Sequence, residues 1–66
     1  MTTTTPLKRT HQSFVDLVYS QNDGGWYIEE SNLNTAKRRV SKKLWRTGTA
    51  ASAAYHAGKV QWKRWD

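Results

Sequence analysis

Cysteine is absent from this 66-residue chain, so neither a disulfide nor a thiolate metal site can stabilise its fold. No apolar run in the sequence approaches the roughly 20 residues that a membrane-spanning helix needs. The N-terminal stretch MTTTTPLKR lacks the apolar core of a secretory signal peptide. These absences are typical of an intracellular protein, and the sequence predicts a cytoplasmic protein without a membrane anchor.

Residues with the chemistry of an active site are also scarce. The only histidines are His11 and His56, and neither has a carboxylate at a useful short spacing. Glu29 and Glu30 are adjacent, so a strand would point them to opposite faces. The Gly24-Gly25 pair lacks the Lys-Ser/Thr signature of a phosphate-binding loop. The sequence therefore predicts a protein that is not an enzyme and has no catalytic residues, metal site or cofactor.

Acidic residues are few, and the charge of the chain is unevenly distributed. The net charge is +6, from 11 Lys and Arg residues against five Asp and Glu residues. Residues 1–36 hold two cations and four carboxylates, a net −2, whereas residues 37–66 hold nine cations and one carboxylate, a net +8. Such an asymmetric field favours encounter with nucleic acid or another acidic surface.

The segment Ala36–Arg46, AKRRVSKKLWR, concentrates this positive charge, with six cations in the ten residues from Lys37 to Arg46. A strand over Arg38–Arg46 would point Val40 and Leu44 inward, and a bulge or an edge position would accommodate Lys42. The residues on the outward side of that strand would be Arg39, Ser41, Lys43 and Trp45. A helix would instead align Leu33, Ala36, Val40 and Leu44 on one stripe, and local propensity favours it. We adopt the strand, because a preceding hairpin is marginal without a third strand.

That hairpin is indicated by two short segments rich in apolar and aromatic residues. Ser13–Ser20 and Trp26–Ser31 have the composition of strands, and the intervening QNDGG contains residues that tolerate the positive φ angles of tight turns. Alternation places Val15, Leu17 and Tyr19 on one face of the first strand. It places Trp26 and Ile28 together on one face of the second.

The segment Gly48–Gly58, GTAASAAYHAG, has the features of a short helix. Thr49 is the expected N-cap, and Gly58 suits the left-handed position at the C-terminal end. A stripe of small side chains should lie on the sheet, formed by Ala50, Ala53, Ala54 and Ala57. The remaining Lys59–Asp66, KVQWKRWD, is expected to be a last short strand or an extended tail packed by its tryptophans.

Together these segments predict an α+β fold, with an antiparallel sheet of three or four strands and one short helix packed on one face. Residues 13–66 would form the single domain. Residues 1–12 would form a disordered tail, because the Thr run at its start has nothing to bury.

The predicted function is non-enzymatic nucleic-acid binding, with duplex DNA as the expected partner. Phosphate contacts need several Lys or Arg side chains on one surface, and aromatic residues among them add base or sugar contacts. Trp45 would stack or wedge, and Lys63 and Arg64, followed by Trp65, would extend the patch. The candidate binding residues are Lys37, Arg38, Arg39, Lys42, Lys43, Trp45, Arg46, Lys63 and Arg64.

A resemblance to known modules rests on the residues from Gly24 onward. They are Gly25-Trp26-Tyr27-Ile28, Lys37-Arg38-Arg39 with Lys42 and Lys43, Leu44-Trp45-Arg46-Thr47, and the Ala-rich helix Ala50–Ala57. This order of features resembles small DNA-binding modules built from a three-stranded sheet and a helix, such as the arm-type N-terminal domains of phage integrases and the plant AP2 domain. The resemblance implies a sheet that enters the major groove, with the helix behind it. The C-terminal KVQWKRWD has no counterpart in those families.

A second hypothesis comes from the general character of the chain. It is small, basic and Thr-tailed, and in this it is similar to many bacteriophage-encoded proteins, some of which bind and disable host proteins. The alternative function is therefore a small effector whose basic face binds and modulates an acidic host protein. Salt dependence separates the two, because phosphate contacts weaken steeply with salt and an interface anchored by buried tryptophans does not.

Overall fold

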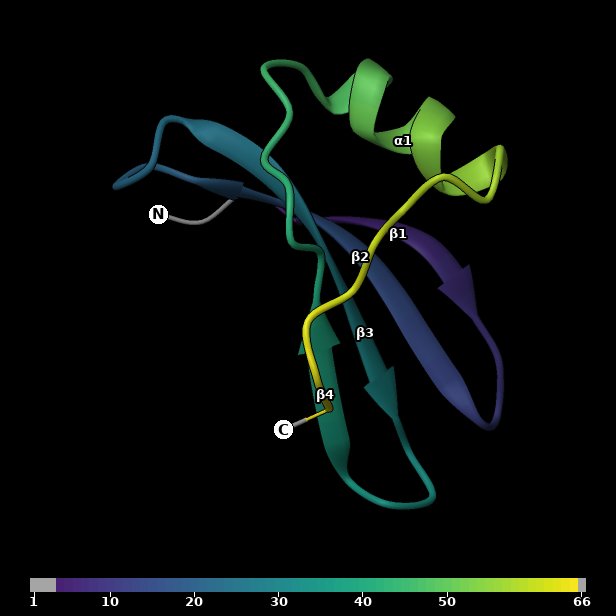
Figure 1. Cartoon of the computed structure of the whole chain (residues 1–66). Helices are drawn as coiled ribbons and strands as arrows, with labels where there is room; N and C mark the ends of the chain where they lie inside the picture. The colour runs from purple at the N-terminus through teal and green to yellow at the C-terminus, as the bar shows by residue number, and fades with distance from the viewer. Residues whose placement is uncertain (1–3, 66) are drawn as a thin grey trace.

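The strands of the protein form an antiparallel meander with a helix on one face (Figure 1). The computed structural model describes residues 4–65. The elements are β1 (Thr4–Arg9), β2 (Ser13–Ser20), β3 (Gly25–Asn32), β4 (Lys37–Val40) and α1 (Gly48–His56), and the strands are neighbours in that order. The predicted α+β fold, an antiparallel sheet with one short helix, is confirmed.

The predicted β2–β3 hairpin is present, with a turn one residue shorter than the expected QNDGG. Ser20 pairs with Gly25 across the turn, and Gly24 adopts a φ of +67° that suits glycine. The Ser20 hydroxyl donates to Asp23 at 2.9 Å and closes the loop. Leu17 therefore lies opposite Ile28, and the apolar alternation of both strands points to one side of the sheet.

Strand β1 corrects the expectation of a disordered tail over residues 1–12. Thr4–Arg9 pairs with β2, and residues 1–3 of the predicted tail lie outside the described residues. Leu7 packs against the core, and the register shifts around it, between Pro6 and Lys8. An edge strand tolerates Pro6, because one side of its backbone has no strand to pair with. The polar composition of the tail concealed the apolar contact that Leu7 supplies.

The basic segment is extended and not helical, as the strand interpretation expected, but β4 ends at Val40 and the pairing with β3 resumes only at the bridge of Trp45 with Trp26. After β4 the Ser41 amide donates to the Ile28 carbonyl at 2.9 Å, and Trp45 and Trp26 exchange two backbone hydrogen bonds of 2.8 Å. The bulge residues 42–44 thus lie opposite Tyr27 alone. The buried Ser41 hydroxyl holds the bulge, since it accepts from the Ile28 amide at 3.1 Å and donates to the Lys43 carbonyl at 2.9 Å.

The sides of this strand are the reverse of those expected. Arg39 lies opposite Glu30 and is on the helix-covered face, whereas Val40 lies opposite Glu29 on the helix-free face. Trp45 is in the core with 9% of its surface exposed, and Leu44 is 43% exposed. The expectation of Val40 and Leu44 inward, with Trp45 outward, is therefore wrong. The reversal is already present at Arg39 and Val40, before the bulge. The bulge adds two residues and so keeps the alternation, which leaves Trp45 facing the core.

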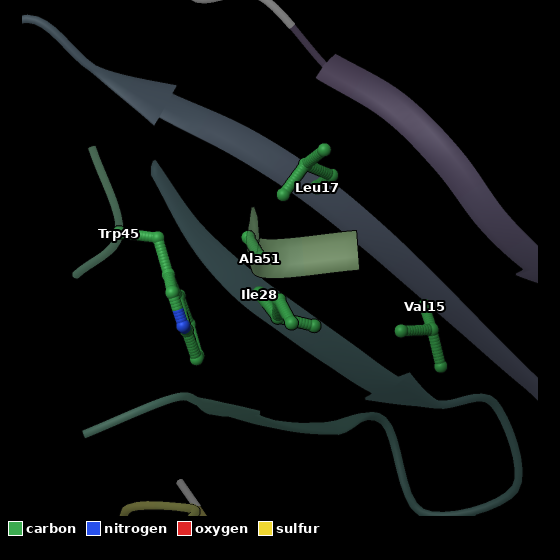
Figure 2. Packing of buried hydrophobic residues seen from close by; sticks show 5 residues of the cluster. All are labelled: Val15, Leu17, Ile28, Trp45 and Ala51. Carbon is green, nitrogen blue, oxygen red and sulfur yellow. The ribbon is translucent and has the colours of Figure 1, made fainter. Parts of the chain in front are cut away.

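The core lies between the sheet and α1. Its buried members are Val15, Leu17, Ile28, Trp45 and Ala51, and Figure 2 shows Ala51 of the helix next to Ile28 of β3. The helix begins after Thr47, whose hydroxyl accepts from the Ala50 amide at 3.1 Å, and Gly58 follows its end with a φ of +69°. The expected N-cap at Thr49 is therefore wrong, and the role of Gly58 is as predicted.

The Ala residues on the buried side of α1 also differ from the expected stripe. Ala51 is fully buried and Ala54 packs against the core, while Ala50, Ala53 and Ala57 are exposed. The helix thus presents a neighbouring face to the sheet. No helix within residues 4–65 is long and apolar enough to cross a membrane.

The C-terminal segment is extended and lies along the outer edge of β4 (Figure 1). The Lys42 amide donates to the Gln61 carbonyl, and the Lys63 amide donates to the Val40 carbonyl, both at 2.8 Å. Trp62 packs against the core cluster. The expected extended tail packed by tryptophan is confirmed up to Trp65, and Asp66 lies outside the described residues. This pairing covers an edge that would otherwise expose unpaired backbone groups.

The bulge predicts the effect of Ser41→Ala. Removing the hydroxyl leaves the fully buried Ile28 amide without its acceptor, so the free energy of unfolding should fall by about 1–3 kcal/mol. Ser52→Ala in α1 is the control, because alanine is the better helix former and the change should be neutral or slightly stabilising. Equal effects of the two variants in urea denaturation would contradict the role assigned to Ser41.

The packing of α1 predicts unequal effects for substitutions of a buried alanine and an exposed alanine of this helix. Ala51→Leu should lower the free energy of unfolding by about 1–3 kcal/mol, because it adds volume to a filled site. Ala53→Leu should change it by less than about 0.5 kcal/mol, since Ala53 is exposed. Thermal unfolding of both variants checks this, and a greater loss for Ala53→Leu would place the wrong face of α1 on the sheet.

Candidate nucleic-acid interface

Arg39 joins three segments of the chain at one point. Its Nε and Nη2 atoms each lie 2.7 Å from Oε1 of Glu30 on β3. Its guanidinium carbon lies over two indole rings of the C-terminal segment, 4.5 Å from the ring centroids of both Trp62 and Trp65. The Arg39 side chain is 27% exposed and the Glu30 side chain 19% exposed. We call these four residues the Arg39 cluster.

The Arg39 cluster fixes the C-terminal segment and does not leave Arg39 free for a ligand. A partly desolvated guanidinium group is stabilised both by the carboxylate and by the faces of aromatic rings. Because Glu30 compensates its charge, Arg39 is less able to neutralise a phosphate than the exposed cations around it. Its place in the candidate site is to hold Trp62 and Trp65 against β4, which also fixes the residues between them.

A pocket of about 310 Å³ lies where β4 meets this C-terminal segment. Its lining residues are Glu29, Arg38, Arg39, Val40, Lys63 and Arg64. The fold thus brings together cations that are some 25 residues apart in the sequence, Arg38 and Arg39 from one segment and Lys63 and Arg64 from the other. Glu29 is the single acidic residue of the lining.

The exposed cations continue from this pocket along β4 and its bulge. We define the basic edge as the exposed residues Lys37, Arg38, Lys42, Lys43, Arg46, Lys63 and Arg64. Arg38 contacts Glu29 at 3.9 Å, with 62% of its side chain exposed. None of the other six forms an ion pair with a carboxylate of residues 4–65. The basic edge therefore presents most of the uncompensated positive charge of the described chain to solvent.

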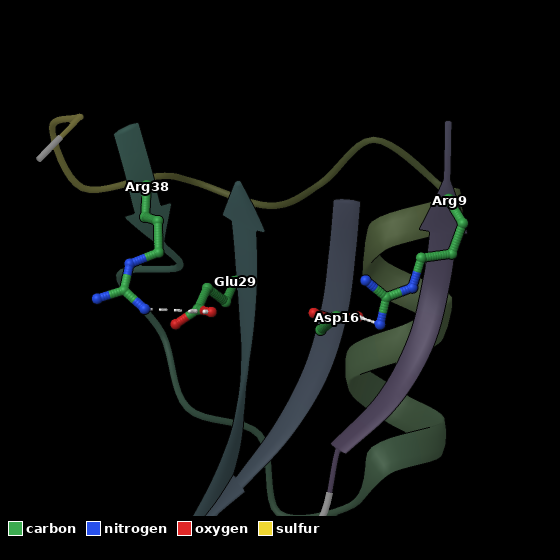
Figure 3. A network of polar contacts seen from close by, with 4 residues as sticks. All are labelled: Arg9, Asp16, Glu29 and Arg38. Atoms are coloured by element: carbon green, nitrogen blue, oxygen red, sulfur yellow. Dashed lines mark ion pairs between the residues drawn. The ribbon is translucent and has the colours of Figure 1, made fainter. Parts of the chain in front are cut away.

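The helix-free face of the sheet has a different electrostatic character. A row of charged residues, one from each strand, crosses it: Arg9, Asp16, Glu29 and Arg38 (Figure 3). Asp16 and Glu29 are direct cross-strand partners, an arrangement that is unfavourable without compensating charge. Arg9 supplies the compensating charge for Asp16, with its Nη2 atom 2.6 Å from Oδ1 of Asp16. That buried oxygen has no other polar partner within residues 4–65. The centre of this face thus carries two carboxylates, and the free cations lie at its edge.

Tyr27 lies on the same face, near Glu29 and Arg38. Burial raises the pKa of its phenol above the ordinary value of 10.0, and the negative charges of Glu29 and Asp23 raise it further, while Arg38 lowers it. The hydroxyl of Tyr27 therefore remains protonated at neutral pH.

Eight of the nine predicted binding residues lie on or next to the basic edge, and one does not. Trp45 is a core residue, so its expected role in stacking or wedging is corrected by its burial. Lys43 contacts it from outside, with Nζ 5.8 Å from the ring centroid. Sequence reasoning missed the partnership of Arg39 with Glu30. Once the β3–β4 turn is placed at residues 33–36, counting outward from that turn pairs these two positions.

The same counting outward from the β2–β3 turn would have placed Asp16 opposite Glu29. This carboxylate pair was also missed, because the expected turn QNDGG is one residue longer than the turn in the structure, where Gly25 already pairs with Ser20. No group of three or more His, Cys, Asp or Glu residues that could hold a metal ion occurs within residues 4–65.

Comparisons with known proteins identify no relative of this chain. No protein-family model matches it, and neither a curated protein nor a solved structure is significantly similar to it. The assignment of function therefore depends on the chemistry of the residues themselves.

The Arg39 cluster predicts different outcomes for two neighbouring arginines. Arg39→Lys keeps the charge but loses the planar group that contacts Glu30 and both indoles. The free energy of unfolding should therefore fall by about 1–2 kcal/mol. The tryptophan emission should also shift to the red as the C-terminal segment loosens. Arg38→Lys is the matched control and should be nearly neutral, because Arg38 is exposed and its ion pair is long. Indistinguishable emission and stability in the two variants would contradict the anchoring role of Arg39.

Proposed function

We propose that this protein is a non-enzymatic nucleic-acid-binding module that contacts phosphates with the basic edge. The observation that carries the proposal is the convergence of Arg38, Lys63 and Arg64 at one pocket, continued by the exposed cations of the bulge. Charges dispersed for solubility alone would not need to gather along one edge of the sheet.

The geometry favours phosphate contact because the cations sit on constrained backbone. Lys42 and Lys63 both donate backbone hydrogen bonds across the junction of β4 and the C-terminal segment. Their side chains therefore project from fixed backbone positions, and this lowers the entropic cost of binding. A row of such cations can follow a phosphate backbone and release its condensed counterions.

The edge of the sheet supports this function better than its helix-free face. Insertion of that face into a groove would bring Asp16 and Glu29 toward the phosphates and base edges of DNA. The exposed cations of β4 and its bulge can instead lie on the phosphate backbone without burying Asp16, and Arg38 pairs with Glu29, the acidic residue that lines the pocket. We therefore propose DNA as the polyanion. Contacts to its phosphates would position the protein without recognising a particular base sequence.

An acidic host protein would use the same cations, and the salt dependence of binding separates this alternative from DNA. Phosphate contacts release condensed counterions, so the logarithm of the affinity falls steeply with the logarithm of salt concentration. Ion pairs at the rim of a protein interface affect mainly the association rate and are screened more gently.

The basic edge predicts a specific change in the salt slope. Lys63→Ala with Arg64→Ala should weaken DNA binding and reduce the log–log slope by about two, one unit for each lost phosphate contact. Lys8→Ala with Lys59→Ala removes the same charge from exposed positions outside the basic edge and should leave the slope nearly unchanged. Fluorescence anisotropy of a labelled oligonucleotide across a salt series measures both.

Two results would count against the proposal. Equal losses for the two double variants would mean that only net charge matters and that no site exists. Failure of the unaltered protein to bind DNA at low salt would exclude the function, and the acidic-protein alternative would take its place.

A further inference from the structure

Trp65 combines exposure with a fixed position at the end of the basic edge. It is 41% exposed, although it is one of the largest apolar side chains of the protein. The guanidinium group of Arg39 lies over its ring, 4.5 Å from the centroid. Because Arg39 is itself held by Glu30 at 2.7 Å, the indole is anchored through a partly buried ion pair.

The anchoring gives Trp65 the properties of a stacking surface. Arg39 occupies one side of the ring, and the exposed area of the residue remains open to a ligand. An aromatic ring that is already oriented loses little conformational freedom when a planar group stacks on it. The three other tryptophans are less suited to this, since Trp45 is in the core and Trp26 and Trp62 pack against it.

The surroundings of Trp65 select an anionic ligand with planar groups. Lys63 and Arg64 immediately precede it, and both line the pocket that Arg38 shares. Cations along a strand path with an exposed aromatic ring among them are the combination that single-stranded nucleic acids require, because each nucleotide offers a phosphate and an unpaired base. In a duplex the base faces are already stacked on one another and are not available to Trp65.

We propose that Trp65 stacks on an unpaired base while Lys63 and Arg64 contact the adjacent phosphates, so that the preferred ligand of the basic edge is single-stranded nucleic acid. This inference rests on the proposed function, and it adds the strand form of the ligand and a residue that discriminates it. Stacking on an indole accepts any base, so the preference concerns strand form and not sequence.

The test compares Trp65→Ala, Trp65→Leu and Trp65→Phe on single strands and duplexes of equal length, about 12 nucleotides, within the site sizes usual for such binding. The alanine and leucine variants should bind oligodeoxythymidylate about tenfold more weakly, whereas duplex affinity should change by less than about twofold. The phenylalanine variant should restore most of the single-strand affinity, because it retains an aromatic face. Leucine separates stacking from simple apolar contact.

Intrinsic fluorescence gives a second readout that folding alone would not change. Binding of the single strand should quench the emission of the unaltered protein, and Trp65→Phe should lose most of that quenching while it keeps its affinity. Leu33→Ala is the matched control, because Leu33 is 44% exposed and lies in the turn after β3, outside the basic edge. It should change neither the affinity nor the quenching.

The outcomes distinguish this inference from the proposed function. If the alanine and leucine variants bind single strands as tightly as the unaltered protein, the stacking role of Trp65 is wrong, even where DNA binding itself persists. If the unaltered protein binds neither strand form at low salt, the proposed function fails as well. Oligouridylate measured in parallel identifies the sugar, and Trp65-dependent binding of either oligomer supports the inference.

Discussion

The ion pair between Arg39 and Glu30 is the contact on which the arrangement of the basic edge depends. This ion pair lies between β3 and β4 on the helix-covered face. The guanidinium group of Arg39 also lies over the rings of Trp62 and Trp65. The C-terminal segment joins β4 through two backbone hydrogen bonds, which alone would hold it weakly. The ring contacts add apolar burial and cation–π attraction, and they thereby fix the cations that precede Trp65.

The charges of the molecule are divided between surfaces with different roles. On the helix-free face the carboxylates of Asp16 and Glu29 are flanked by arginines, so attraction and repulsion are nearly balanced within the sheet. Along the basic edge the cations lack such partners among residues 4–65, apart from the long contact of Arg38. A ligand that supplies negative charge therefore gains most at the edge, which is the physical basis of the proposed function.

The sequence was sufficient to predict the fold class and the β2–β3 hairpin, because the apolar alternation and the turn residues both act locally. It was not sufficient to orient the strand that follows Lys37. Its alternation was predictable, but the side that faces the core depends on the register with β3, which places Arg39 opposite Glu30 and which no local pattern reveals. Trp45 lies on the same side as Arg39 and is therefore a core residue. The cations of the site were predictable from their density, but their convergence with Lys63 and Arg64 requires tertiary pairing.

The central claim, that nucleic acid binds at the junction of β4 and the C-terminal segment, is tested most directly by NMR titration of the protein with an oligonucleotide. The backbone amides of residues 38–43 and 61–65 should show the largest shift changes. Among the four indole N–H signals, that of Trp65 should move most and that of the buried Trp45 least. Changes centred on α1 or on β1, or uniformly small changes throughout, would contradict the account.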